Sequence, residues 1–173
     1  MQKYRYTLRA LLFISLILSS LAVSARGVYQ TDQDFLTEAF NSSVPKSKVV
    51  WVKGELAKMI KTILGHNYAG LRIRYWRDPQ RSVWILEEIG KEKPITFGIV
   101  IADNKIAAIK VLAFRESRGG EIRHPAFTLQ FQQAQLDNMQ LDRHIDGVSG
   151  ATLSVRAMTV VARLALYLDN FTG

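Results

Sequence analysis

The C-terminal segment from Thr152 onward repeats apolar side chains at helical spacing. Its apolar members are Leu153, Ala157, Val160, Val161, Leu164 and Leu168. Spacings of three and four residues place them on one face of a helix with 3.6 residues per turn, and so wide an apolar face must pack against a core. Its polar members are Thr152, Arg156, Thr159 and Arg163. These share the other face, so the sequence predicts a long packed helix on which Thr152 points away from the core.

Most of the chain between residues 71 and 114 has the pattern of β-strands. The predicted strands cover residues 71–75, 82–89, 95–102 and 105–114. The first alternates apolar and polar residues, as half-buried strands do. Asp78-Pro79 favours a turn before the second strand, and Asp103-Asn104 joins the last two in a hairpin because both residues tolerate a positive φ. The last strand is apolar on both faces apart from Lys110, which predicts a central position with helices covering one side.

Two shorter helices are expected before these strands. Thr31 to Asp34 has the pattern of a capping box that opens a helix ending at Phe40. Residues 41–48 are polar and indicate a linker. From about Val49 to Leu64 apolar and lysine side chains again recur at helical spacing, and Gly65 is suited to end this helix.

Together these elements predict one α+β domain. A chain of 173 residues with 48% hydrophobic residues has the size and composition of a single domain with its own core. The expected architecture is a twisted, mostly antiparallel sheet packed by helices. Residues 26–93 are expected to supply the N-terminal helices and strands of this domain, and residues 94–170 its functional core.

The residues from Asp146 to Ser154, Asp-Gly-Val-Ser-Gly-Ala-Thr-Leu-Ser, stand at the start of the C-terminal helix. Ser149 is suited to cap this helix, which makes Thr152 the third helical residue. Gly150 and Ala151 are small enough to let a bulky group approach. The free N–H groups and the positive dipole end of a helix favour an anion, so the segment indicates a site for a phosphate ester.

The next turn of the same helix adds a positive charge. Arg156 lies four residues after Thr152 and is placed to pair with a phosphate oxygen. On spacing alone, a simpler interpretation also fits: Ser149 merely caps the helix, and Thr152 is an ordinary exposed residue of the first turn.

The string from Asp146 to Thr152, followed by Leu153-Ser154, resembles the flavinylation motif of the FMN-binding domain found in the sodium-translocating NADH:quinone oxidoreductase and in the Rnf complex. The resemblance implies that the Thr152 hydroxyl carries FMN through a phosphoester bond. It also implies a periplasmic flavin transferase that uses FAD as donor and magnesium as metal, and that recognises Asp146. The resemblance covers roughly the C-terminal half of the chain, so residues 94–170 are expected to form the FMN-binding core.

A second part of the resemblance is the segment from Glu116 to Gly120, which stands where the family usually has Glu-Thr-Pro-Gly-Leu-Gly. Ser117 keeps a hydroxyl and Gly119 a flexible backbone, while Arg118 replaces a stiffening proline. A loop with two glycines lets the backbone approach a flat ring, and Arg118 could stabilise negative charge on a reduced isoalloxazine. Glu116, Ser117 and Gly119 thus join the expected FMN contacts. The alternative is a plain turn with solvated Glu116 and Arg118.

The N-terminus is typical of a secretory signal. Lys3, Arg5 and Arg9 precede an apolar run that is followed by small residues, so residues 1–25 are expected to be a signal peptide cleaved after Ala25. The expected location is the periplasm. Retention of the segment as an inner-membrane anchor is the alternative, although the uncharged stretch is slightly short for a stable span. The chain has no cysteine, which rules out a lipoprotein anchor, disulfides and iron–sulfur ligation.

Other functional classes have little support in the sequence. The 23 basic and 15 acidic residues give a net charge of +8, which suits an anionic cofactor, an acidic partner or a membrane surface. No basic run is long enough to indicate nucleic-acid binding. The histidines lack metal-ligand spacing, so no metal site is expected at His66, His124 or His144. Packing in the core is expected of the tryptophans, which are Trp51, Trp76 and Trp84. Walker, Rossmann and nucleophile–base patterns are absent, so no independent catalytic residues are predicted.

The sequence therefore favours an exported flavoprotein that carries FMN on Thr152. It would pass electrons between a membrane oxidoreductase and an extracytoplasmic acceptor, acting as an electron-transfer protein or a component of a larger complex rather than a stand-alone enzyme. Its expected partners are the flavin transferase and a membrane redox protein or complex. Two alternatives stay open: a basic periplasmic accessory or binding module of the same fold without flavin, and a reductase component whose flavin reduces a small substrate directly.

Overall fold

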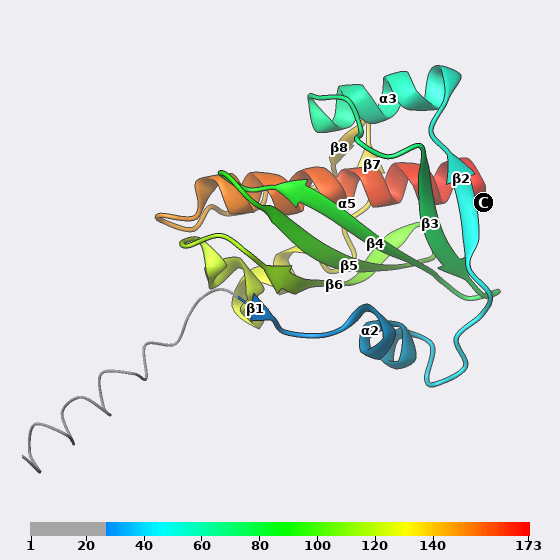
Figure 1. Ribbon diagram of the computed structural model, residues 1–173, viewed down its shortest axis with the longest axis horizontal. Helices are drawn as coiled ribbons and strands as arrows, with labels where there is room; N and C mark the ends of the chain where they lie inside the picture. Colours follow the sequence, from blue (N-terminus) through cyan, green and yellow to red (C-terminus); the bar gives the residue numbers. More distant parts are fainter. Residues whose placement is uncertain (1–26) are drawn as a thin grey trace, which may run out of the picture.

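A six-stranded antiparallel sheet forms the centre of the protein in the computed structural model, which describes residues 27–173. Its strands are β1 (Gly27–Val28), β2 (Lys48–Trp51), β3 (Arg72–Arg77), β4 (Ser82–Ile89), β5 (Pro94–Ala102) and β6 (Lys105–Phe114). Their spatial order is β1-β6-β5-β4-β3-β2, so β2 to β6 form a meander in which sequence neighbours pair (Figure 1). The predicted α+β class with a mostly antiparallel sheet is confirmed. The predicted signal peptide and its cleavage after Ala25 lie outside the described residues.

Tight turns set the register of this meander. Asp103 and Asn104 join β5 to β6 with φ values of 53° and 59°, the left-handed conformation that short hairpin loops require. Before β4, the Asp78 carboxylate accepts hydrogen bonds from the backbone N–H groups of Gln80 (2.8 Å) and Arg81 (2.7 Å). Both turns, and the bounds of the predicted strand 82–89, agree with the sequence.

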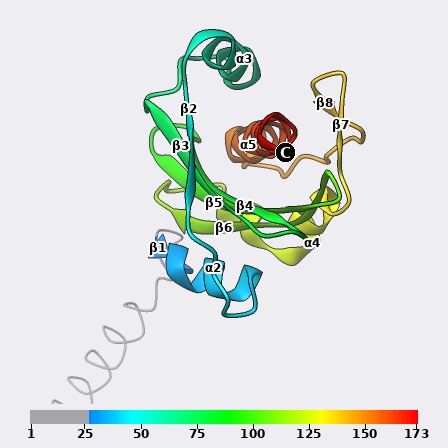
Figure 2. The same ribbon diagram turned by 90° about the vertical axis from the view of Figure 1, so that its right-hand side faces the viewer.

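Helices cover both faces of the sheet. They are α2 (Asp32–Ala39), α3 (Gly54–Leu64), the short α4 (Pro125–Thr128) and α5 (Thr152–Thr172). Short 3-10 helices occupy Gly120–Arg123 and Leu129–Phe131, and a small hairpin joins β7 (Leu136–Asp137) to β8 (Gln140–Leu141). Figure 2 shows the sheet curving around α5, with α3 and the β7–β8 hairpin on either side of that helix and α2 on the opposite face.

The two faces have separate apolar clusters. On the α5 face, Trp84 is fully buried and stacks on Tyr75 with ring centroids 4.6 Å apart. On the α2 face, the ring of Phe35 lies so close to β5 that a Cβ at Gly98 would overlap it. Glycine at this position therefore allows α2 to approach the sheet. Thr31 caps α2 by accepting a 3.1 Å hydrogen bond from the Asp34 N–H, as the capping-box pattern predicts.

The C-terminal end of α5 is fixed to the sheet by a buried polar network. The Asp169 carboxylate accepts hydrogen bonds from Arg77 (2.5 Å) and from the Ser82 hydroxyl (2.5 Å). The Ser82 hydroxyl in turn accepts one from the indole N–H of Trp84 (2.8 Å). Because Asp169 is only 7% exposed, these donors replace the water it loses on folding.

Several local predictions are wrong. Residues 48–51 are not part of a linker and a helix but form β2, because Val49, Val50 and Trp51 have strand-forming side chains that pair with β3. The second helix accordingly starts at Gly54 and ends, as predicted, at Gly65 with φ 83°. Trp51 is 55% exposed rather than packed in the core.

The predicted position of β6 is also only partly right. Its outer neighbour is the two-residue β1, so the centre of the sheet is β4 and β5 rather than β6. Its second apolar face packs under α2, and Lys110 on that face pairs with Glu38 of α2 at 2.6 Å. Helices thus cover both faces of β6, not one.

The last helix is more enclosed than its amphipathic pattern suggests. Buried residues extend around α5 to Ala162, Ala165 and Leu166, because α3 and the β7–β8 hairpin flank the helix. Leu153, predicted to face the core, is instead 42% exposed, because it lies in the first turn beyond these neighbours. Within residues 27–173, no helix has the length and apolar character needed to cross a bilayer.

Candidate functional site at the N-terminal end of α5

The start of α5 differs from the predicted capped helix. The N-cap residue is Ala151, not Ser149, so Thr152 is the first helical residue rather than the third. The cause is a turn in which Gly150 has φ 80° and the Ala151 N–H donates to the Val148 carbonyl at 2.9 Å. Ser149 lies within this turn, exposed to solvent, and caps nothing in the described structure.

The first turn of α5 therefore keeps free hydrogen-bond donors. Within the described residues, the backbone N–H groups of Thr152, Leu153 and Ser154 have no acceptor from the protein. The Thr152 side chain is exposed, as predicted, and its hydroxyl has no partner among the same residues. Unpaired N–H groups at the positive end of a 21-residue helix dipole attract negative charge.

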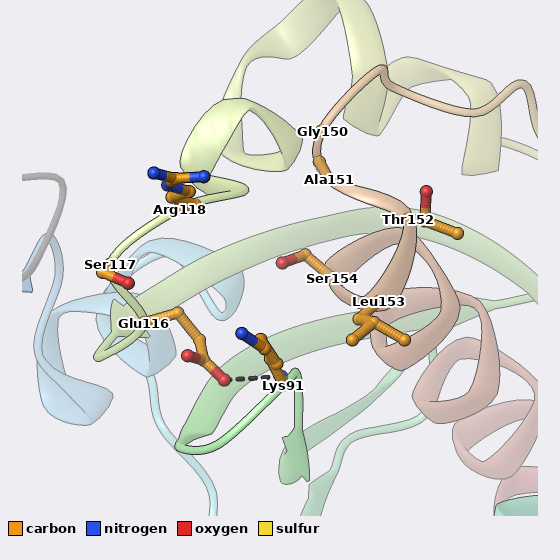
Figure 3. Close-up of a pocket in the computed structure, with 9 residues that line it drawn as sticks. All are labelled: Lys91, Glu116, Ser117, Arg118, Gly150, Ala151, Thr152, Leu153 and Ser154. Atoms are coloured by element: carbon orange, nitrogen blue, oxygen red, sulfur yellow. Dashed lines mark hydrogen bonds between the residues drawn. The ribbon is translucent and has the colours of Figure 1, made fainter.

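A cavity of about 550 Å³ opens beside this helix end. It is lined by three separate segments of the chain, which are Lys91 in the β4–β5 turn, Glu116 to Arg118 after β6, and Gly150 to Ser154 at the start of α5. Figure 3 shows these segments around a common space, with Thr152 at its rim and Ser154 and Leu153 closer to Lys91 and Glu116. The volume lies within the range of sites for small molecules and cofactors.

Glu116 holds two of these segments together. The carboxylate is 5% exposed and accepts hydrogen bonds from the backbone N–H groups of Lys91 (2.6 Å), Glu92 (2.6 Å) and Lys93 (2.8 Å). Burial by itself raises the pKa of Glu116, but these three donors and the nearby Lys91 charge outweigh it and leave the pKa below its ordinary value. Glu116 is thus ionised at neutral pH and fixes the turn that carries Lys91. Of the two interpretations of this loop, solvation of Glu116 is wrong.

Gly119 packs the loop after β6 against α5. Its φ is 84°, and a Cβ built there would lie 2.5 Å from the Ser154 hydroxyl oxygen and 3.4 Å from the Ala151 Cα. Only glycine combines this backbone conformation with this close approach. The loop and the helix start therefore form one continuous wall of the cavity.

Two cations, Lys91 and Arg118, line the cavity together with the Glu116 carboxylate, which is buried and already accepts three backbone hydrogen bonds. Lys91 is exposed and reaches only Glu92, at 3.6 Å. Arg118 is exposed and has no ion-pair partner in the described part of the chain. A second hollow of about 300 Å³ shares Ser117, Arg118 and Gly150 with the first, so Arg118 stands between two open spaces. The site is therefore suited to an anionic ligand.

The predicted site residues fall into two groups. Those that line the main cavity are Glu116, Ser117, Gly150, Ala151 and Thr152. Gly119 lines the second hollow. Asp146, Ser149 and Arg156 line neither hollow.

The residues outside the hollows have other surroundings. Asp146 is exposed, its backbone N–H donates to Gln130 at 2.7 Å, and its carboxylate lies 3.7 Å from the His144 ring. A guanidinium nitrogen of Arg156 lies 3.7 Å from the place a Cβ would take at Gly65. Arg156 thus extends toward the C-terminal end of α3, where the helix dipole favours a cation.

Lys91, Leu153 and Ser154 are lining residues that the sequence reasoning did not select as ligands. Leu153 and Ser154 belong to the motif Asp146–Ser154, so the motif could have indicated them. No sequence pattern indicates Lys91, because only the folded sheet brings the β4–β5 turn next to α5. Among the described residues, no group of three or more His, Cys, Asp or Glu side chains is placed to hold a metal ion.

A comparison with known protein families gives a match that covers this site. Residues 90–167 match the FMN-binding domain family. The matched segment begins at the β4–β5 turn and ends in α5, so it includes all three segments that line the cavity. Comparisons with curated proteins and with solved structures gave no match.

Proposed function

Because residues 90–167 belong to the FMN-binding domain family, the protein is a flavin-binding protein, and we propose that it carries FMN covalently on Thr152 as an exported electron carrier. One observation carries the proposal. Thr152 is the exposed first residue of an uncapped helix and stands at the rim of a cavity of cofactor size.

The residues present fit FMN on chemical grounds. The free N–H groups of Thr152, Leu153 and Ser154 suit the phosphate, whose negative charge the helix dipole also favours. Beside them the cavity offers the half-exposed Leu153 and the backbone of Gly150 for contact with a flat ring. Lys91 and Arg118 supply positive charge. The phosphate and the ring of FMN thus each have a matching group.

The exposed hydroxyl is suited to esterification by an enzyme. In the proposed reaction, the Thr152 oxygen forms a bond to the phosphorus of the FMN half of FAD. The pyrophosphate bond breaks, and AMP leaves with the hydroxyl proton. A flavin transferase with magnesium would catalyse this step. Asp146 is exposed and lies outside the cavity, so its carboxylate stays accessible to such an enzyme.

The chain's own residues then have distinct roles toward the cofactor. Glu116 positions Lys91 by fixing the β4–β5 turn, and Gly119 keeps the loop against α5. Lys91 and Arg118 stabilise negative charge in the cavity. Bound FMN supplies one- and two-electron transfer. Because attachment would be covalent, ring contacts need not provide the affinity, and the ring can stay accessible to redox partners.

Export and partners belong to the same proposal. The N-terminal sequence supports secretion, with cleavage after Ala25, and a covalent bond suits a compartment where lost flavin is not replaced. The electron donor or acceptor on one side would be a membrane redox protein or complex. The other partner would be an extracytoplasmic acceptor.

Mass spectrometry of the intact protein tests the attachment. Co-expression of the full chain with a flavin transferase should give protein that carries one FMN and stays yellow after denaturation. Thr152→Ala should lose the FMN, and Thr152→Ser should keep at least part of it. Thr159→Ala, which removes a hydroxyl of the same helix outside the motif, is the matched control and should be fully flavinylated. Flavin on Thr152→Ala, or none on the wild type, would refute the assignment; the second result would favour the accessory module without flavin.

Kinetic measurements separate the carrier from a reductase. A carrier should be reduced by a protein donor and reoxidised by a protein acceptor without consuming another substrate. Steady turnover of a small molecule with a supplied electron donor, in the absence of any protein acceptor, would instead identify a reductase.

A further inference from the structure

The edge of the sheet farthest from β1 has an exposed apolar and basic surface. On the face of β2 and β3 turned away from α5, Trp51 stands opposite Arg72, and Val49 stands opposite Arg74. The alternating residues Val50 and Ile73 point inward to the α5 cluster, so the four outer side chains share one face. Trp51 is 55% and Val49 39% exposed, and both arginines are exposed. These four residues are called the β2–β3 patch.

The charge around the patch is uncompensated. Lys48 is the first residue of β2, Lys46 and Lys53 flank this edge strand, and none of the three is buried. Neither these lysines nor Arg72 and Arg74 have an ion pair or side-chain hydrogen bond within residues 27–173. The segments 41–54 and 65–77, which contain β2, β3 and the adjoining loops, include no Asp or Glu. Lys48 stands opposite Tyr75 and alternates with Val49, so it points to the α5 side. In this part of the described chain, Lys46, Lys53 and the two arginines are therefore free cations near the exposed indole ring.

Protection of the sheet edge does not explain this composition. Lysines along an edge strand discourage pairing with another chain, but an exposed Trp and Val beside them do the reverse. Protein interfaces are enriched in Trp and Arg, as this patch is, but they are depleted in Lys, so the lysines beside the patch favour a membrane over an acidic protein partner. Trp at the surface combined with Lys and Arg is instead typical of proteins that bind the interface of anionic membranes.

We propose that the β2–β3 patch docks the protein onto a membrane containing anionic phospholipids. The cations contact lipid phosphates, and Trp51 enters the headgroup region with Val49 beside it. This surface is separate from the flavin site and does not depend on the flavin being bound.

Docking at this surface orients the molecule. The patch lies near the C-terminal end of α5, and Thr152 begins the opposite end, as Figure 1 shows. A helix of 21 residues is about 30 Å long at 1.5 Å per residue. The cavity beside Thr152 therefore lies at the far end of α5 from the patch, separated from it along the helix axis.

Vesicle binding tests the proposal with the full chain. Wild-type protein should cosediment with vesicles of phosphatidylglycerol and phosphatidylcholine, more weakly at high salt, and much less with phosphatidylcholine alone. The double variant Arg72→Gln/Arg74→Gln should partition roughly 30-fold more weakly, the effect of two lost surface charges. The matched control Arg123→Gln/Arg156→Gln removes two exposed arginines nearer the Thr152 end and should bind like the wild type. All these proteins share the same N-terminal residues, so differences between them report on the patch.

Tryptophan fluorescence gives a second measurement at the patch itself. Brominated anionic lipids should quench the wild type, and Trp51→Phe should lose most of this quenching, because Trp84 is fully buried and Trp76 is partly buried against the α2-side cluster. Unchanged thermal unfolding of the variants shows that they are folded. Equal binding by the Arg72/Arg74 variant and the control, or quenching of Trp51→Phe as strong as that of the wild type, overturns the proposal. Binding to polyglutamate but not to vesicles also overturns it and identifies an acidic protein as the partner.

Discussion

Replacement of Glu116 by glutamine tests whether this buried carboxylate fixes the β4–β5 turn. The carboxylate accepts three backbone hydrogen bonds of 2.6, 2.6 and 2.8 Å. Glutamine keeps the size of the side chain and one acceptor oxygen but removes the charge. Hydrogen bonds to a charged group contribute about 1.5–3 kcal/mol each, against about 1 kcal/mol for neutral ones.

The expected loss is smaller than the sum of these differences. The neutral side chain is less costly to bury, and water can reach the exposed turn residues Lys91 and Lys93. Glu116→Gln should therefore lower the free energy of unfolding at neutral pH by about 2 kcal/mol. For a chain of this length, that corresponds to a fall in Tm of roughly 4–8 °C.

The pH dependence gives the sharper test. The pKa of Glu116 is lower in the folded protein than in the unfolded chain, so its ionisation stabilises the fold. This stabilisation is fully present above the unfolded pKa, roughly 4.3, and is lost as the pH falls through the lower folded pKa. The stability difference between wild type and Glu116→Gln should therefore narrow in the acid range below that value.

Urea unfolding at a series of pH values measures this difference. Glu121→Gln is the matched control, because Glu121 is exposed on the same loop and should change stability by less than about 0.5 kcal/mol. Equal stability of Glu116→Gln and wild type at neutral pH would refute the role given to Glu116. So would a difference that stays constant into the acid range.

Two further substitutions test the packing around the site and the anchoring of α5. Gly119→Ala should cost about 2 kcal/mol in urea unfolding, because the residue has φ 84° and its new Cβ would meet the Ser154 hydroxyl. The double variant Gly119→Ala/Ser154→Ala should recover part of the lost unfolding free energy, because the hydroxyl that clashes is gone. If the effects of the two substitutions simply add, the proposed contact is contradicted. Asp169→Ala should cost about 2–4 kcal/mol, since it leaves the partly buried Arg77 without its carboxylate. Asp137→Ala, at an exposed position, is its control, and equal effects of the two would show that the Asp169 network contributes nothing.

Local chemistry made much of the fold predictable from the sequence. Asp103-Asn104 specified the β5–β6 hairpin because few other pairs accept two positive φ values. Thr31 and Gly65 marked the start of α2 and the end of α3 through capping preferences that act within one turn. The position of Thr152 on the solvent side of α5 followed from helical periodicity.

The errors arose where tertiary structure decides between local alternatives. Val49 to Trp51 fits either the edge of a helix or a short strand, and only pairing with β3 favours the strand. Ser149 is a good capping residue, but the turn at Gly150 places the helix start two residues farther on. Lys91 lies at the cavity because its backbone N–H donates a hydrogen bond to Glu116, which is 25 residues away in sequence. Sequence patterns do not indicate so distant a contact.

The meander topology has a consequence for the order of maturation. Each strand from β2 to β6 pairs with its neighbour in sequence, and β3 to β6 are joined by short turns, so this part of the sheet can assemble from local hairpins at low entropic cost. Because α5 comes last in the chain, its packing would bring Thr152, the proposed attachment residue, beside the β4–β5 turn and the loop after β6. An attaching enzyme that contacts the β4–β5 turn, the loop after β6 and the start of α5 together would act only on folded chains. Cofactor would then not be attached to partly folded protein.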